Sequence, residues 1–226
     1  MSRLRLSPSI LTADFGRIAD EVRSVAEYVD WFHLDVMDGH YVPNLTFGPA
    51  IVEAIRRAVD QPLHVHLMIT EPARYAGMFV DAGASRISFH PETVEDTGAV
   101  IERIRSLGAG PGIAVHPDVA VDSVREYLND IDVVLMMTVR PGFGGQKFLF
   151  EVVPKIEQAQ RLVREYGSGA DIEVDGGVNL TTVDETVAAG AEIVVAGSGV
   201  FDGIDAGAAA RRMRERLNEL EKPGHR

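Results

Sequence analysis

Short apolar runs alternate with longer amphipathic segments along the whole chain. Short apolar runs are typical of buried strands, and apolar positions three or four residues apart indicate helices. We expect strands over residues 4–11, 31–37, 63–69, 86–90, 112–116, 132–139, 172–175 and 193–196. Helices are expected from about 14 to 29, over 49–59, from 72, and over 94–107, 121–128, 152–166, 181–189 and 206–220. Thr70 and Glu71 are expected to cap the helix that starts at Pro72, and Thr93 with Asp96 to form a capping box.

A strand–helix unit therefore repeats about eight times, which is the count of a closed (β/α)8 TIM barrel. The alternative is an open doubly wound sheet, but no mononucleotide fingerprint follows the first strand. No linker or low-complexity segment divides the 226 residues. We therefore expect a single domain over residues 1–226, with about 221–226 a mobile tail. In this fold the C-terminal ends of the strands carry the chemistry.

The stretch from Trp31 to Asn44 carries the most informative pattern. Alternate residues of a strand share a face. One face is apolar and needs helices to cover it, and it carries Phe32, Leu34 and Val36, whereas the other carries His33, Asp35 and Met37. Gly39 and Pro43 end the strand, so Asp35 and Met37 lie near its C-terminal end.

The strand over 63–69 repeats this design, with His64, His66 and Met68 on one face, and the strand over 172–175 ends in Asp175. Closing the barrel brings together four polar side chains from three strands, namely His33, Asp35, His66 and Asp175. Two imidazoles and two carboxylates suit one divalent ion per chain, such as Zn²⁺, Fe²⁺, Mn²⁺ or Co²⁺. A histidine that is merely hydrogen-bonded in the core is the simpler reading of either imidazole taken alone.

Three glycine-rich turns follow the sixth, seventh and eighth strands, over residues 141–146, 176–177 and 197–199. Glycine lets successive backbone N–H groups converge on an anion. Barrels commonly bind phosphate after the seventh and eighth strands. The sequence therefore predicts phosphate-binding loops after strands 6, 7 and 8.

Methionines gather at the same strand ends: Met37, Met68 and the pair Met136 and Met137. Neighbours on a strand face opposite ways, so only one of the pair points inward, and periodicity does not decide which. They are either core gap-fillers or thioethers that contact a flat, electron-rich intermediate.

Composition narrows the class of protein. The hydrophobic content of 46% and charged content of 25% are ordinary for a globular protein. A net charge of −12 disfavours nucleic-acid and anionic-membrane partners. The absence of cysteine excludes disulfides and thiolate metal ligands. No run is long enough for a signal peptide or a membrane span, so we expect a cytoplasmic protein. We also expect a homo-oligomer, either a dimer or a hexamer.

Nearly the whole chain resembles the ribulose-phosphate 3-epimerase family. The resemblance is carried by residues 7–11, 13–15, 33–44, 66–68, 89–92, 137–146, 173–177 and 195–198. The most specific segments together are His33–Asn44 and the Pro-Gly-Phe-Gly-Gly-Gln loop. The family's third active-site methionine stands four residues before the proline of that loop, which implies that Met137 points inward and Met136 packs against a helix.

The resemblance implies a metal-dependent isomerase that interconverts D-ribulose 5-phosphate and D-xylulose 5-phosphate through a cis-enediolate. It implies metal binding by His33, Asp35, His66 and Asp175, with Asp35 as base and Asp175 as acid for ribulose 5-phosphate. The implied contacts to the phosphorylated ketose come from Ser9, Met37, His66, Met68, Met137, Gly142, Phe143, Gly144, Gly145, Gly176, Gly177, Gly197 and Ser198.

Three positions depart from the family pattern: His64, His116 and Arg140. They leave open another ketose phosphate, such as D-allulose 6-phosphate, as substrate. A metal-assisted aldolase or decarboxylase on the same barrel would need a lysine or a single acid–base residue at the C-terminal ends of the strands. No lysine is expected at a strand end. A non-catalytic phosphate-binding barrel is also disfavoured, because it would have no use for four polar side chains whose burial costs free energy.

Overall fold

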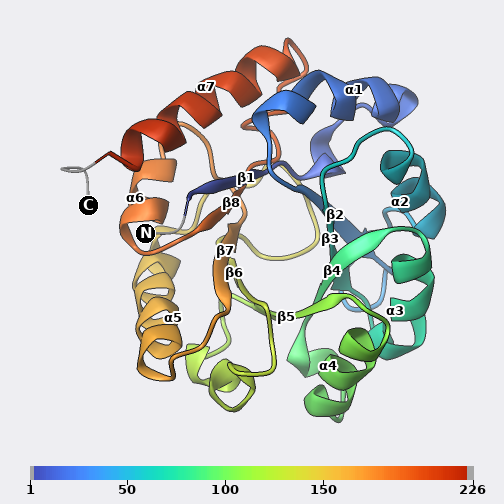
Figure 1. Cartoon of the computed structure of the whole chain (residues 1–226), viewed down its shortest axis with the longest axis vertical. Coiled ribbons are helices and arrows are strands. Elements are labelled where there is room, and N and C mark those ends of the chain that lie inside the picture. Colours follow the sequence, from blue (N-terminus) through green and yellow to red (C-terminus); the bar gives the residue numbers. More distant parts are fainter. Residues whose placement is uncertain (1–2, 223–226) are drawn as a thin grey trace.

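The computed structural model describes residues 3–222. In these residues one sheet of eight parallel strands forms the centre of the molecule (Figure 1). The strands are β1 (Arg5–Ser7), β2 (Phe32–Met37), β3 (Leu63–Met68), β4 (Ala84–Phe89), β5 (Gly110–Val115), β6 (Val133–Met137), β7 (Asp171–Asp175) and β8 (Ile193–Val195).

The sheet closes between its first and second strands. The strand order runs β1-β8-β7-β6-β5-β4-β3-β2, which leaves β1 and β2 at the two ends. The His33 amide donates to the Pro8 carbonyl at 3.0 Å, and Ser9 and His33 form an isolated parallel bridge. The predicted (β/α)8 barrel is thus confirmed, and the doubly wound sheet is wrong.

Helices surround the barrel on the outside (Figure 1). The α-helices among residues 3–222 are α1 (Ile18–Val25), α2 (Pro49–Arg56), α3 (Pro72–Asp81), α4 (Thr97–Ser106), α5 (Val153–Glu165), α6 (Val183–Ala188) and α7 (Ala206–Leu220). None of the helices in this range is both long and apolar enough to cross a membrane. The expected tail lies mostly outside the described residues, although Glu221 accepts a hydrogen bond from the Leu4 amide.

The main apolar core lies between the strands and the helices. As the alternation predicted, it contains Phe32, Leu34 and Val36. Met136 belongs to it too, whereas Met137 lies inside the barrel with Ala114, Leu135 and Val139. This is the orientation of the two methionines that the sequence implied.

Two expected helix caps are wrong. The helix predicted over 94–107 begins at Thr97, because Asp96 is its N-cap and accepts from the Ala99 amide at 2.9 Å. The Thr93 hydroxyl instead donates to the His90 carbonyl at 2.6 Å, so no capping box forms. Glu71 precedes α3 without a side-chain cap, and Thr70 binds Asp38 through its amide and hydroxyl.

Two other predicted helices contain 3₁₀ segments. The first is divided into a 3₁₀ turn (Phe15–Arg17), α1 and a second 3₁₀ turn (Ala26–Tyr28). The segment after β5, Val121–Tyr127, is 3₁₀ throughout. Its buried residues Val121 and Val124 are three apart, and a helix with three residues per turn keeps both on the barrel side.

Candidate active site

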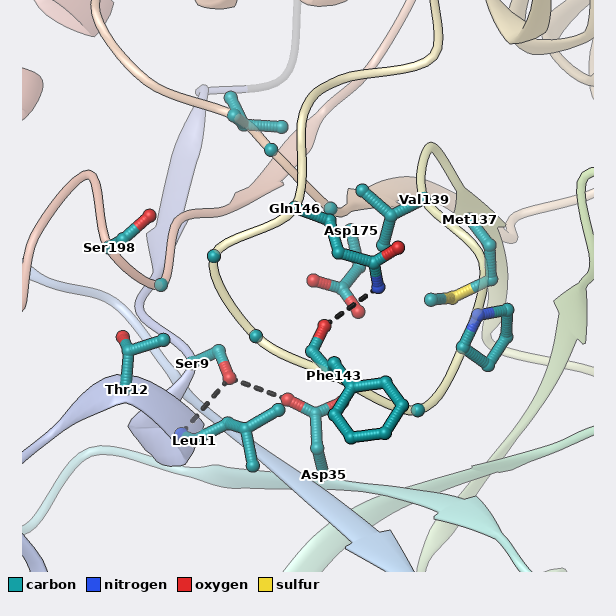
Figure 2. A pocket seen from close by; sticks show the side chains of 18 of the residues that line it. Ser9, Leu11, Thr12, Asp35, Met137, Val139, Phe143, Gln146, Asp175 and Ser198 are labelled. Carbon is teal, nitrogen blue, oxygen red and sulfur yellow. Dashed lines mark hydrogen bonds between the residues drawn. The ribbon is translucent and has the colours of Figure 1, made fainter. Parts of the chain in front are cut away.

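A pocket lies at the C-terminal ends of the strands (Figure 2). Its lining includes fourteen of the expected site residues: Ser9, Asp35, Met37, Met68, Met137, Gly142, Phe143, Gly144, Gly145, Asp175, Gly176, Gly177, Gly197 and Ser198. The loop from Pro141 to Gln146 passes over it, and the Gln146 side chain donates to the Phe143 carbonyl at 2.8 Å. The pocket therefore combines the predicted carboxylates, methionines and glycine turns.

Other residues of the pocket were not predicted from the sequence. They are Leu11, Thr12, Val139 and Val178, whereas Pro141 and Gln146 belong to the loop predicted over residues 141–146. Leu11 and Thr12 belong to a 3₁₀ turn, Ile10–Thr12, which begins three residues after the end of β1, so the strand predicted over 4–11 is shorter than expected. Since strand ends carry the site in this fold, the position of these two residues after β1 was a usable signal.

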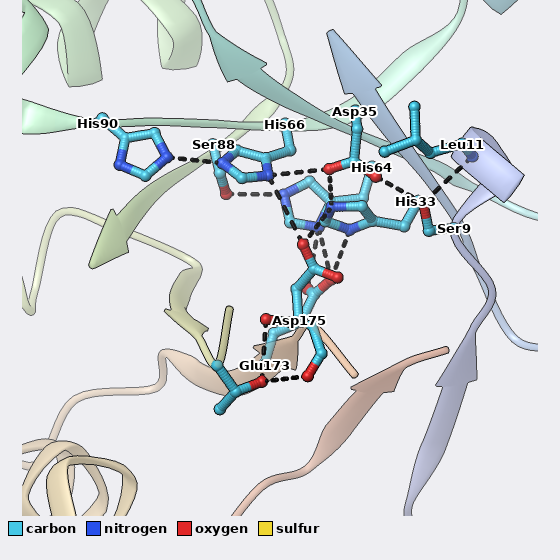
Figure 3. Close-up of polar contacts among 12 residues, drawn as sticks. Ser9, Leu11, His33, Asp35, His64, His66, Ser88, His90, Glu173 and Asp175 are labelled. Carbon is cyan, nitrogen blue, oxygen red and sulfur yellow. Dashed lines mark hydrogen bonds and ion pairs between the residues drawn. The ribbon is translucent and has the colours of Figure 1, made fainter. Parts of the chain in front are cut away.

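His33 and His66 lie behind the pocket wall and reach the two aspartates from β2 and β3 (Figure 3). The Nε2 of His33 lies 3.3 Å from Oδ1 of Asp35 and 3.9 Å from Oδ2 of Asp175. The Nδ1 of His66 lies 3.2 Å and 4.0 Å from the same two oxygens. One ligand atom of each residue falls within 4.8 Å of all the others.

This donor set fits one divalent metal ion. The Nε2 of His33 is buried without a hydrogen-bond partner, although it faces both carboxylates. A buried polar atom without a partner is costly. Two imidazole nitrogens and two carboxylate oxygens are ligands that Zn²⁺ and Fe²⁺ accept. A cation among them would also offset the mutual repulsion of the two buried carboxylates.

Burial and neighbouring charges shift the pKa values of the two aspartates in opposite directions. Burial alone would raise the pKa of Asp35, but the adjacent His33 charge and hydrogen bonds hold it well below its usual range. Burial, and then the charge of Asp35, raise the pKa of Asp175 to about 8. In the metal-free protein Asp35 is thus ionised and Asp175 holds a proton. Such a separation is how paired carboxylates take opposite acid–base roles.

Ser9 fixes the orientation of Asp35. Its hydroxyl donates to Oδ2 of Asp35 at 2.5 Å and accepts from the Leu11 amide at 3.3 Å (Figure 2). Since Ser9 lies two residues after β1 and Asp35 lies in β2, this contact joins the two ends of the sheet where the barrel closes.

The glycine turns provide room beside the carboxylates. Gly177 has a φ of +67°, and a Cβ there would lie 2.5 Å from the Phe148 amide nitrogen. A side chain at this position would therefore collide with backbone. Ser198 is exposed in the turn after β8, and the Gly197 that precedes it lies beside Thr12. The turns thus border a space lined by backbone groups.

The three residues that depart from the family pattern lie outside the pocket lining. Arg140 pairs with Asp118 on the surface, with Nη2 3.2 Å from Oδ1. The Nδ1 of His116 accepts from the Asp118 amide at 3.1 Å. His64 is fully buried below the four-residue cluster, and its ring lies 5.0 Å from that of His33.

Known proteins of similar sequence carry one family name. The model of the ribulose-phosphate 3-epimerase family matches residues 5–201. The ribulose-phosphate 3-epimerase of Bacillus subtilis is 45% identical over 213 residues, which cover 93% of this chain and 98% of that protein. The Escherichia coli protein of the same name is 39% identical over 227 residues and 100% of both chains.

Solved structures agree on the fold. KGPDC from Streptococcus mutans in complex with D-R5P superposes with a TM-score of 0.77 at 16% identity, covering 97% of this chain and 99% of that one. Orotidine 5'-phosphate decarboxylase from Pyrococcus horikoshii gives a TM-score of 0.70 at 14% identity, covering 94% and 99%. These likenesses show the barrel, whereas the sequence matches show the family. The chain belongs to the ribulose-phosphate 3-epimerase family, whose members are isomerases that act on carbohydrates.

Proposed function

We propose that this protein interconverts D-ribulose 5-phosphate and D-xylulose 5-phosphate by inverting carbon 3, with a divalent metal ion. The observation that carries the proposal is the pairing of Asp35 and Asp175, which converge on one pocket from β2 and β7. Inversion needs a base on one face of the sugar and an acid on the other. Two carboxylates from different strands can supply these two groups.

The aspartates divide the proton transfers. Asp35, ionised and oriented by Ser9, takes the proton from C3 of ribulose 5-phosphate. The resulting cis-enediolate lies between the two carboxylates, and Asp175 delivers a proton to the opposite face. In the reverse direction the roles exchange.

His33, Asp35, His66 and Asp175 would hold the metal. Bound there, a divalent ion supplies Lewis-acid stabilisation of the negative charge that develops next to C3. Asp35 is a weak base, so stabilisation of this charge accounts for most of the barrier reduction.

The glycine turns bind the phosphate. Residues 142–145, 177 and 197, whose backbone N–H groups can bind an anion, line the pocket together with Ser198. This mode of binding needs no lysine, and none lines the pocket. A Schiff-base aldolase therefore lacks its nucleophile here. Met37, Met68 and Met137 place polarisable sulfur beside the planar intermediate.

A coupled assay across a panel of ketose phosphates tests the proposal. We expect the highest kcat/KM for D-ribulose 5-phosphate and very low turnover of unphosphorylated ribulose. A higher kcat/KM for D-allulose 6-phosphate would identify the longer ketose as substrate and leave the chemistry unchanged. Absence of epimerisation with every ketose phosphate, in protein loaded with a divalent ion, would overturn the proposal.

A further inference from the structure

A second group of buried polar side chains lies against the four-residue cluster, on the side of the N-terminal ends of the strands (Figure 3). Its centre is Glu173, which precedes Asp175 by two residues on the same face of β7 and is 1% exposed. Oε1 of Glu173 lies 3.0 Å from Nδ1 of His33 and 3.0 Å from Nδ1 of His64. Neither Glu173 nor His64 lines the pocket, so substrate does not reach them.

We propose that Glu173, held in place by His64, is a positioning residue that fixes the tautomer and ring orientation of His33, so that its Nε2 is presented to the metal. The inference rests on the metal site of the proposed function. A carboxylate can only accept hydrogen bonds, so both Nδ1 atoms that contact it carry hydrogen. With hydrogen on Nδ1, neutral His33 keeps its lone pair on Nε2.

The free nitrogen of His33 is the one that this assignment requires. Nε2 is the ring atom without a hydrogen-bond partner, and it faces Asp35 and Asp175. The opposite tautomer would point an N–H group at the metal position and place a lone pair against the Glu173 carboxylate. Both contacts would be unfavourable, so Glu173 selects the metal-binding form.

His64 is anchored from its other side. Its Nε2 lies 2.7 Å from the hydroxyl of Ser88, which is buried on β4. The hydroxyl can donate to Nε2, which leaves Nδ1–H to donate to Glu173, 2.9 Å from Oε2. Ser88, His64, Glu173 and His33 therefore form one chain of hydrogen bonds, in which both histidines donate to Glu173 and the last ring reaches the metal position. This gives His64 a role in the support of the site.

The same residues invite a different reading. His33, His64 and Glu173 offer ligand atoms close enough together for a second ion. However, Glu173 already accepts from both rings, and the guanidinium of Arg86 lies 4.0 Å from its Oε2. A second cation would have to displace both hydrogens beside an arginine. We therefore expect one ion per chain.

The histidine ¹⁵N spectrum of Zn²⁺-loaded wild-type protein tests the tautomer directly. We expect His33 to coordinate Zn²⁺ through Nε2 and to keep a slowly exchanging hydrogen on Nδ1. Coordination through Nδ1 would overturn the inference. This measurement needs no variant, so it stands even where a substitution prevents folding.

Variants then test what the chain of hydrogen bonds contributes. Loss of a carboxylate that supports a metal-binding histidine typically weakens metal affinity about 10–100-fold. We expect that loss for Zn²⁺ in Glu173→Leu, measured by competition with a chelator. His64→Leu removes the donor to Glu173 and should weaken Zn²⁺ binding, whereas His64→Asn keeps an N–H near the position of Nδ1 and should stay closer to wild type.

Thr186→Val is the matched control for lost stability. It removes a buried hydrogen bond, from the Thr186 hydroxyl to the Thr182 carbonyl at 2.8 Å, on α6 and outside the site. Its Zn²⁺ affinity should equal that of wild type even where its Tm falls. A Zn²⁺ affinity equal to that of wild type in folded Glu173→Leu would overturn the positioning role alone. The same conclusion would follow if the wild-type chain bound two ions and the variant lost one of them. Wild-type protein that binds no divalent ion would overturn the metal site as well.

Discussion

The hydroxyl of Ser9 lies 2.5 Å from Oδ2 of Asp35, and both residues are buried. A hydrogen bond to a charged group contributes about 1.5–3 kcal/mol, so Ser9→Ala should lower kcat/KM about tenfold or more. The bond favours the ionised form of Asp35, so its loss should raise the pKa of that carboxyl. The acidic limb of the pH–rate profile should accordingly move to higher pH.

Ser7 provides the control for this variant. It is also buried on β1, but its Oγ has no hydrogen-bond partner among the described residues. Ser7→Ala should leave kcat/KM close to wild type. Equal kinetics for the two alanine variants would remove Ser9 from the site.

Purified protein should contain about one divalent metal ion per chain, given its two imidazole and two carboxylate donors. Elemental analysis measures the content, and a chelator followed by each candidate metal measures the dependence. Activity should fall when the chelator removes the metal and return when the metal is added back. Full activity in metal-free protein would end the metal hypothesis.

Metal affinity should rise with pH. In the metal-free protein the pKa of His33 is raised above its usual value by Asp35, although burial opposes this, and burial raises the pKa of Asp175 to about 8. A metal ion needs both groups deprotonated, so binding below that pH must release protons. The Zn²⁺ affinity should increase with pH up to and through about pH 8, where Asp175 loses its proton. Calorimetry in buffers of different ionisation enthalpy should record net proton release, and net uptake would contradict the assignment.

The two-aspartate mechanism predicts the origin of the hydrogen at C3. The acid exchanges with water between turnovers, so product formed in D₂O during the first turnovers should carry deuterium at C3. Asp175→Asn should abolish epimerisation, and its metal content must be measured beside its rate because Asp175 is also an expected ligand. Product that retains the substrate's own C3 hydrogen would indicate a single base.

A negative charge in the phosphate loops should weaken substrate binding. Ser198→Asp should raise KM sharply, because a carboxylate would stand where the phosphate binds. Ile204→Asp is the matched control, since Ile204 is 91% exposed and lies outside the pocket lining. Gly145→Asp should also raise KM, but the φ of +71° at Gly145 adds backbone strain. An unchanged KM in Ser198→Asp and Gly145→Asp would place the phosphate elsewhere.

Strand periodicity predicted the barrel and the inward residues near its strand ends, whereas the glycine-rich turns and the family resemblance indicated most of the other pocket residues. Alternation over Phe32–Met37 separates the inner residues from the outer ones, because a strand in a barrel has two unlike faces. The position of Asp35 and Asp175 near strand ends then followed from the fold alone. Local capping was predicted less well, since Thr93 and Asp96 are both good caps and only the structure selects Asp96.

The support below the site was not predicted. His64 was placed on the same face as His66, but Glu173 was not connected with it, because 109 residues separate the two. The available signal was the spacing of Glu173 and Asp175, which puts both carboxylates on the inner face of one strand. Which of several inward residues meet across a barrel depends on register and stagger, and sequence periodicity does not contain that information.

The closure of the barrel at Ser9 and His33 links catalysis to the mechanical integrity of the fold. β1 is short, and its junction with β2 is made by Ser9 and His33, the residues that orient the proposed base and face the candidate metal site. Any opening of this seam separates Ser9 from Asp35 before the helices unfold. Activity should therefore be lost at a lower denaturant concentration than helical circular dichroism. A bound ion would connect β2 and β3 to β7, which are far apart in the sequence, and would therefore stabilise the closed barrel.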